Sequence, residues 1–320
     1  MPLICEPHNL AIAFLRAARG KHGRREVMAF RDNLWDNLNR MAVELANGSF
    51  RFGGYHTFKV FDPKERLICA APFDQRVAMH AIMRVCHPVF EAYQMPHSFA
   101  SRIGKGTYAA IDKAMMLCRC YDWYAKLDVR HYFDTINHDI LISLLSSLFK
   151  DQVLLCIFKQ LLGTYEVNIG RGLPIGNLTS QYFANHYLAV ADHYAMRQLH
   201  APAMVRYMDD VLFFGLERKS LLELIRNYVS FVNCSLRLEM HPPVFNRTSL
   251  GIPFCGYVVR ARGLRLNQRS RHRYRIKMAK LRLAMDLGEI SLTTYGRRVQ
   301  ALRAFTAKAQ ARAFELNESL

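Results

Sequence analysis

Apolar residues recur along most of this chain at the three- to four-residue spacing of amphipathic helices. The first such stretch is interrupted near residues 20–23, where glycines and charged residues replace the apolar ones. Helices are therefore predicted in residues 9–46 (with that break), 73–90, 107–117, 139–162 (one or two helices), 177–199, 220–232, 269–287 and 292–314.

Other segments alternate between apolar and polar residues, as strands do. Residues 55–61 and 67–71 alternate in this way, and the linker between them, Asp62-Pro63-Lys64-Glu65-Arg66, is rich in turn-forming residues. This pattern predicts a β-hairpin with a basic tip. Further short strands are predicted in residues 121–128, on both sides of Asp209-Asp210 in residues 203–214, and near residues 254–257. The mixture indicates an α+β fold whose strands cluster at acidic positions.

The composition indicates a globular protein with a polyanionic partner. Apolar residues make up 51% of the 320 residues, which is enough for a packed core and excludes intrinsic disorder. The net charge of +18 points to nucleic acid, with an anionic membrane surface as the weaker alternative. No apolar run approaches the ~20 residues that span a bilayer, and no secretory signal pattern is present. We therefore expect a cytoplasmic protein, in a bacterial or phage-infected cell, that does not enter a membrane.

Eight cysteines are distributed along the chain, several of them in apolar stretches, such as Cys69, Cys86 and Cys156. Cys118 and Cys120, the closest pair, are separated by one residue, whereas structural zinc sites usually have two to four residues between paired cysteines. We expect buried, reduced thiols rather than disulfides or a zinc site.

Two apolar segments run into carboxylates. Asp209 and Asp210 interrupt an otherwise apolar hairpin, and Asp128 ends the apolar strand that begins near Tyr121. Partly buried carboxylates that lie side by side raise each other's pKa unless a cation compensates. A solvated turn would explain one Asp-Asp pair, but a second acidic strand end favours a shared cation. Mg²⁺ prefers oxygen ligands, and two such ions can serve in-line phosphoryl transfer.

These acidic residues lie in motifs that resemble those of reverse transcriptases. Tyr207-Met208-Asp209-Asp210 resembles the YxDD box, and Asp128 with Phe133 and Asp134 resembles the acidic motif that precedes it. Residues 101–107 resemble a sequence block of bacterial and group II intron enzymes, and Phe254-Cys255-Gly256-Tyr257 resembles the primer grip. The resemblance implies a right-hand polymerase fold. Its parts would be an N-terminal helical extension (1–54), fingers and palm (55–260) and a short, basic helical thumb (261–320).

The segment Gly172–Gln181 resembles one subgroup in particular. Ile175 stands where most bacterial and intron enzymes have glutamine, and Gln181 stands where they have proline. This form is similar to the reverse transcriptases of diversity-generating retroelements, as are residues 62–66, 242–248 and 263–267. The resemblance implies copying of a template-repeat RNA into cDNA, with errors concentrated at template adenines. It also implies a small basic accessory variability protein as partner, whose oligomeric state the sequence leaves open.

Ile175 offers a physical hypothesis for the errors. An amide at this position could hydrogen-bond the incoming nucleotide and penalise poor geometry, because an unmet buried polar group costs ~1–3 kcal/mol. Isoleucine offers only its shape, so discrimination is expected to weaken. The hypothesis does not explain why adenine is singled out, and simple packing at the start of a helix is the alternative interpretation of Ile175.

The resemblance also implies roles for individual residues. Asp128, Asp209 and Asp210 would be the catalytic metal ligands, with the Val129 carbonyl as an additional oxygen, for two Mg²⁺ ions that Mn²⁺ could replace. Either Tyr132 or Phe133 would be the steric gate that clashes with a ribose 2′-hydroxyl. The remaining nucleotide-binding residues would be Arg66, Arg76, Ile175, Gly176 and Gln181, with Lys64 either a further triphosphate contact or a solvated turn residue.

Contacts with template RNA and the cDNA primer–template duplex are expected from a second set of residues: Arg102, Lys105, Phe254, Gly256 and Tyr257. The basic residues between Arg269 and Lys280 fit a thumb that follows the duplex, and the same residues could instead bind the accessory protein or a structured RNA. His241 stands near the position where related enzymes carry a lysine that protonates pyrophosphate. It is interpreted either as a general acid or as a surface histidine.

Two alternatives to this assignment stay open. One is a retron-like, defence-associated or group II intron-derived reverse transcriptase, against which Ile175 and Gln181 argue. The other is a catalytically silent RNA-binding relative, against which the three intact aspartates argue.

Overall fold

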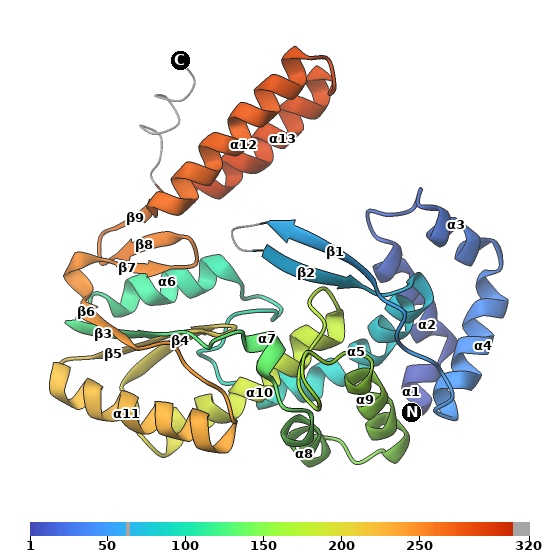
Figure 1. The fold of residues 1–320 in the computed structure, drawn as a ribbon, viewed down its shortest axis with the longest axis horizontal. Helices are drawn as coiled ribbons and strands as arrows, with labels where there is room; N and C mark the ends of the chain where they lie inside the picture. Colours follow the sequence, from blue (N-terminus) through green and yellow to red (C-terminus); the bar gives the residue numbers. More distant parts are fainter. Residues whose placement is uncertain (62–64, 310–320) are drawn as a thin grey trace.

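The computed structural model describes residues 1–61 and 65–309 (Figure 1). Prolines at the first helical positions start α1 and α2, where the missing N–H carries no penalty. The helices of this first part are α1 (Pro2–Cys5), α2 (Pro7–Ala18), α3 (Arg25–Asp32) and α4 (Leu34–Ala46). Helices α1, α2 and α3 pack on the long helix α5 (Phe73–Tyr93), and α4 packs on the other three. The rings of Phe14, Phe30 and Phe73 lie against one another, two of the three pairs edge-on. The break predicted near residues 20–23 is therefore confirmed.

A four-stranded antiparallel sheet forms the centre of the molecule, in the order β4–β5–β3–β6. Its strands are β3 (Trp123–Leu127), β4 (Ala203–Tyr207), β5 (Asp210–Gly215) and β6 (Val244–Arg247). Alternate residues of β5 face opposite sides: Val211 and Phe213 enter one core, and Leu212 and Phe214 enter the other. Both faces of the sheet are therefore covered, which explains why these strands read as nearly continuous apolar runs.

Different elements cover the two faces. The first core includes side chains of α10 (Leu178–Arg197) and α11 (Arg218–Ser235), and it extends without interruption to the N-terminal helices. The second core includes side chains of α6 (Thr107–Leu117) and of a small sheet. That small sheet consists of β7 (Ile252–Phe254), β8 (Tyr257–Arg260) and β9 (Gly263–Leu266), and the 3₁₀ helix η1 (Thr248–Leu250) precedes it.

Two parts project from this body. The hairpin of β1 (His56–Phe61) and β2 (Glu65–Ala70) pairs as predicted, although its turn, with Lys64, lies outside the described residues. The basic helices α12 (Gln268–Asp286) and α13 (Leu292–Ala307) form an antiparallel pair that extends away from the sheet (Figure 1). The Asn267 and Ser291 side chains cap the two helix N-termini.

Three further helices follow β3 in the chain and precede α10: α7 (Tyr132–Thr135), α8 (His138–Leu148) and α9 (Gln152–Gly163). The predicted helical segment 139–162 is thus two helices, because Asp151 caps a new helix N-terminus. None of the helices in the described ranges is long and apolar enough to cross a bilayer.

Two expectations need correction. Asp210 does not lie in the turn between two strands, because it begins β5 and pairs with Tyr207. The prediction of buried cysteines is wrong for Cys120, Cys156 and Cys234, which are exposed, although all eight cysteines are free thiols. Cys156 stands in an apolar stretch but on the outer side of its helix, which a run of apolar letters does not reveal.

Candidate active site

The three aspartates predicted from the sequence lie together at one end of the central sheet. The antiparallel register pairs Leu127 with Val211, so the next pair along places Asp128 opposite Asp210. Asp209 stands in the tight turn between β4 and β5, after Met208, whose φ of 56° is left-handed. Residues more than eighty positions apart therefore meet because two strand ends coincide.

Their proximity is visible in their electrostatics. Burial and the adjacent Asp128 carboxylate raise the pKa of the Asp209 carboxyl to about 7. Burial also raises the pKa of Asp210 to about 6, although the Lys126 ammonium acts in the opposite direction. Near neutral pH the cluster thus has too little positive charge around it to ionise fully.

Lys126 is a functional candidate that the sequence interpretation did not single out. Its Nζ donates to Asp210 Oδ2 at 2.9 Å and to the Pro253 carbonyl at 2.8 Å. Because Lys126 lies two residues before Asp128 on β3, the two side chains emerge on the same face of the sheet. This two-residue spacing is the feature of the sequence from which Lys126 could have been identified as a neighbour of the acidic cluster. The ammonium joins the acidic cluster to the strand that leads into the predicted primer grip.

The donor set fits a divalent cation. Asp210 Oδ1 is buried and has no hydrogen-bond partner in the described part of the protein, and Asp209 and Asp128 repel each other. Asp210 is hydrogen-bonded to Lys126, and within the described residues no three His, Cys, Asp or Glu side chains are grouped so that they could hold a metal ion by themselves. Mg²⁺ does not require one, because it usually binds one or two carboxylates together with water and substrate phosphates.

The backbone beside Asp128 is held by the segment that follows α11. His241 N–H donates to the Asp128 carbonyl at 2.9 Å, and Val129 forms a bridge with Met240. The His241 side chain itself is exposed. A role for the Val129 carbonyl as a metal ligand stays a prediction.

The two candidates for the steric gate differ in their surroundings. Tyr132 is 3% exposed, and its hydroxyl donates to the Ala184 carbonyl of α10, inside the core. Phe133 is only partly buried, and its ring packs edge-on against that of Tyr132. A nucleotide could touch Phe133 but not the buried face of Tyr132.

The residues predicted to surround the nucleotide lie on several elements. The Ile175 carbonyl accepts from Cys69 N–H at 2.8 Å, which joins this segment to β2. A Cβ at Gly176, where φ is +113°, would lie 2.9 Å from Ile68 Cγ2, so only glycine allows this contact. Gln181 Oε1 accepts from Ser101 Oγ at 3.2 Å.

The two predicted phosphate-binding arginines are far from equivalent. Arg66 is exposed on β2 of the hairpin. Arg76, on α5, forms an ion pair with Glu26 of α3 and lies over the Phe73 ring, with its Nε buried and without a hydrogen bond among the described residues. In this arrangement Arg76 links two helices, and Arg66 is the arginine open to a ligand.

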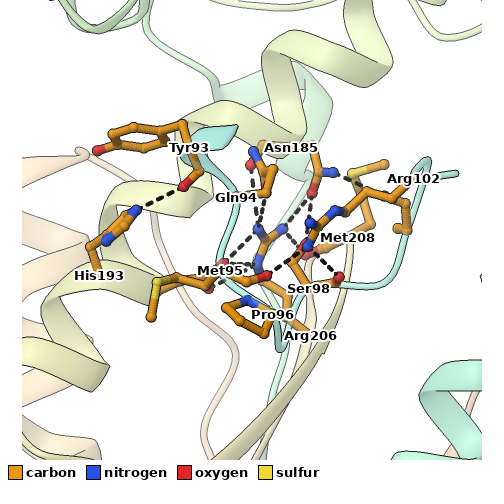
Figure 2. A network of polar contacts seen from close by, with 12 residues as sticks. Tyr93, Gln94, Met95, Pro96, Ser98, Arg102, Asn185, His193, Arg206 and Met208 are labelled. Carbon is orange, nitrogen blue, oxygen red and sulfur yellow. Dashed lines mark hydrogen bonds and ion pairs between the residues drawn. The ribbon is translucent and has the colours of Figure 1, made fainter. Parts of the chain in front are cut away.

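The two basic residues expected to contact the template are used within the protein. Arg102 Nε donates to both Glu91 carboxylate oxygens, at 2.9 and 3.0 Å, and its Nη1 donates to the carbonyls of Met95 and Ser98 (Figure 2). Its side chain is 7% exposed. These internal partners give Arg102 a structural role, and its contact with the template stays a prediction. Lys105 Nζ likewise donates to the Pro96 carbonyl at 2.5 Å.

The predicted primer grip forms the hairpin between β7 and β8. Phe254 pairs with Tyr257, and Cys255 and Gly256 make the turn with φ values of 48° and 87°, the signs of a type I′ turn. The Phe254 and Tyr257 side chains are buried in the second core. Only the turn is therefore available to a primer, while the aromatic residues hold it in place.

Comparison with known proteins agrees with this arrangement. The family model for reverse transcriptase (RNA-dependent DNA polymerase) matches residues 61–242. The putative COX1/OXI3 intron 1 protein of Saccharomyces cerevisiae is 25% identical over 168 residues, which cover 49% of this chain and 20% of that protein. An uncharacterized 91 kDa protein in a cob intron of Schizosaccharomyces pombe is 26% identical over 148 residues, covering 44% of this chain and 17% of that protein. The chain thus spans about a fifth of the length of these relatives.

Solved structures share the fold at low sequence identity. Apo telomerase from Candida tropicalis superposes with a TM-score of 0.54 at 12% identity, covering 73% of this chain and 53% of that one. Telomerase from the same organism in complex with a TWJ fragment of telomeric RNA gives 0.53 at 13% identity, covering 89% and 58%. The predicted α+β architecture of the right-hand polymerase type is confirmed.

The raised pKa of Asp209 predicts a pH-dependent effect of its removal. In metal-free buffer, Asp209→Asn should increase the free energy of unfolding at pH 8 by on the order of 2 kcal/mol and change it little at pH 4. Between the ordinary value of 3.8 and about 7, the folded wild type retains a proton that the unfolded chain has lost. Wild-type stability therefore falls as pH rises through this window, and asparagine removes that loss.

Urea denaturation in EDTA at the two pH values measures the effect. Asp122→Asn is the matched control, because Asp122 is exposed at the other end of β3. If Asp209→Asn changed the free energy of unfolding equally at both pH values, the raised pKa of Asp209 would be contradicted.

Proposed function

The chain belongs to the reverse transcriptase family, and on that premise we propose that it synthesises DNA on an RNA template at the site of Asp128, Asp209 and Asp210. The observation that carries the proposal is the convergence of these carboxylates from two strand ends, with raised pKa values for Asp209 and Asp210. A buried cluster of carboxylates in a chain of net charge +18 suits a reaction between polyanions that divalent cations assist.

The three aspartates, with the Val129 carbonyl, would hold two Mg²⁺ ions, or Mn²⁺ in their place. When bound, such ions favour ionisation of the primer 3′-hydroxyl and stabilise the charge of the departing pyrophosphate. Lys126 contributes by offsetting part of the Asp210 charge, so that the cluster can fold before any cation arrives. Because both faces of the central sheet are packed, the sheet fixes the positions of the carboxylates. Phosphoryl transfer depends on such fixed positions of the reacting groups.

The incoming nucleotide would lie between the hairpin and the sheet end. Arg66 is exposed on β2 and can reach a triphosphate, for which a guanidinium fork is suited. Phe133, partly exposed and five residues after Asp128 in the chain, is the better candidate for the steric gate. Ile175 and Gly176, which are hydrogen-bonded and packed against β2, would form the wall behind the base.

The primer–template duplex would run from the β7–β8 turn along the basic helix pair. Arg269, Arg271 and Lys280 are exposed on α12 and can neutralise backbone phosphates. Because α12 and α13 extend from the sheet as one unit, they can follow a duplex without disturbing the acidic site (Figure 1).

Within the family, we propose an enzyme of the diversity-generating retroelement type. Ile175 and Gln181 support this assignment, and it implies adenine-directed errors, a template-repeat RNA and a small basic accessory protein. The second candidate is an intron-type enzyme, which the intron proteins of the two yeasts favour. The two candidates differ in one measurable property: only the first predicts errors concentrated at template adenines.

Primer extension on an RNA template tests the activity. Asp128→Asn should lower the rate at least ~10³-fold, because it removes a carboxylate from the site of charge development. Asp122→Asn, at the exposed end of the same strand, should retain the wild-type rate. Equal activity of the two variants would remove the acidic cluster from the reaction, and a wild type that binds RNA without extending a primer would support the silent RNA-binding alternative.

Phe133→Ala should increase insertion of ribonucleotides relative to deoxyribonucleotides by about 10-fold or more, since the ring that would clash with a 2′-hydroxyl is gone. Tyr132→Phe should leave this ratio unchanged, because the lost hydroxyl points to Ala184 in the core. Single-nucleotide incorporation kinetics with rNTP and dNTP measure the ratio. An unchanged ratio in a folded Phe133→Ala variant would exclude Phe133 as the steric gate.

Ile175→Gln should reduce misincorporation opposite template adenine several-fold, since an amide would add a polar contact that poor base-pair geometry leaves unmet. Ile169→Gln is the control, as Ile169 is 96% exposed. Sequencing of cDNA from a template of mixed composition measures the error at each base. Unchanged errors in Ile175→Gln would exclude Ile175 as a cause.

A further inference from the structure

A buried ion pair lies directly behind the acidic turn. Arg206 of β4 and Asp192 of α10 both have fully buried side chains. Arg206 Nε donates to the two Asp192 carboxylate oxygens at 2.8 Å each. Such a pair adds little net stability, because the loss of hydration offsets the attraction between the charges. Its position, rather than its energy, is therefore the informative feature.

The same guanidinium reaches the turn that carries Asp209. Arg206 Nη1 donates to the Met208 carbonyl at 3.1 Å and to Asn185 Oδ1 at 2.8 Å (Figure 2). Met208 has a left-handed φ of 56°, a conformation that is unfavourable for a residue with a side chain. The Met208 carbonyl belongs to the peptide that leads into Asp209. A contact that fixes this peptide therefore fixes where the Asp209 side chain starts.

Arg206 is itself held from three directions. Its backbone N–H donates to the His97 carbonyl at 2.8 Å, and its own carbonyl accepts from Phe99 N–H at 2.9 Å. Asn185 of α10, which accepts from Arg206, also donates to the Ala100 carbonyl at 2.9 Å. Arg206 is thus tied, through its backbone and its guanidinium, to α10 and to the segment that follows α5.

We propose that Arg206 is a positioning residue for the reaction: it holds the Met208–Asp209 peptide so that the Asp209 carboxylate faces Asp128 at the separation that accepts a divalent cation. This inference rests on the proposed function. It extends that function to a residue that touches neither substrate nor metal and acts through a backbone carbonyl.

Arginine is required because of its shape. Its planar fork offers five N–H donors, enough to bind Asp192, Asn185 and the Met208 carbonyl at the same time. A lysine ammonium at this position keeps the charge but is a single point, which cannot lie near Asp192 and Met208 together. Arg206→Lys thus separates the fork geometry from the buried charge.

The test compares Arg206→Lys with Glu91→Gln. Glu91 pairs with the buried Arg102 and is itself partly exposed. Among the described residues this pair forms no hydrogen bond with Met208, so the control weakens a neighbouring ion pair without changing the hydrogen bonds of the turn. Arg206→Lys should lower kcat about 10- to 100-fold and raise the Mg²⁺ concentration for half-maximal rate at least ~3-fold. The KM for dNTP should change less than about twofold, and Glu91→Gln should match wild type throughout.

A second readout does not depend on activity. Mn²⁺ binding to the protein alone, followed by electron paramagnetic resonance, should weaken at least ~3-fold in Arg206→Lys and stay unchanged in Glu91→Gln. If wild type shows no polymerase activity but this difference in Mn²⁺ affinity holds, the proposed function fails and the positioning role stands.

If Arg206→Lys does not fold, the double variant Arg206→Gln/Asp192→Asn replaces it, because it removes both buried charges together and leaves neither unpaired. The same two readouts are expected to change in the same direction. A folded variant with wild-type kcat and wild-type Mn²⁺ affinity would overturn the proposal. So would a variant whose whole defect is weaker binding of the primer–template.

Discussion

Repulsion between carboxylates is the constraint around which the rest of this structure is arranged. Burial and the nearby Asp128 carboxylate both raise the pKa of Asp209, so a negative charge on Asp209 is costly to hold at this place. Neighbouring elements oppose that repulsion: the register of β3 and β5 fixes the backbones, and Lys126 pairs with Asp210. Arg206 holds the turn from behind. A cluster that is costly without a cation is thereby kept ready to receive one.

The central sheet can hold such a cluster because both of its faces are packed. Val211 and Phe213 are buried on one side, and Leu212 and Phe214 on the other, so β5 cannot slip by one residue without exchanging two well-filled cores. A slip would also separate Asp128 from Asp210. The same strand register therefore determines which side chains are buried and where the carboxylates lie. A change in the register would disrupt the core and the acidic site together.

The sequence predicted the parts of the site that depend on local pattern. The apolar runs that end at Asp128 and Asp209 are strands because of their composition, and their meeting follows from antiparallel pairing. It did not predict how side chains are shared between distant elements. Arg102 was predicted to contact the template from a loop, but its guanidinium is hydrogen-bonded to Glu91 and to two backbone carbonyls. Arg206 and Asp192 lie on β4 and α10, and they become partners only when these two elements come together in the fold. Tyr132 and Phe133 are adjacent letters whose different burial depends on the position of α10.

The most direct test of the central claim is a crystal structure with primer–template, dNTP and Mn²⁺, in which anomalous scattering locates the metal. Two peaks are expected, roughly 3.5–4 Å apart and in contact with the Asp128 and Asp209 carboxylates. Absence of any peak within coordination distance of both aspartates, in crystals that contain the nucleic acid and nucleotide, would contradict the claim.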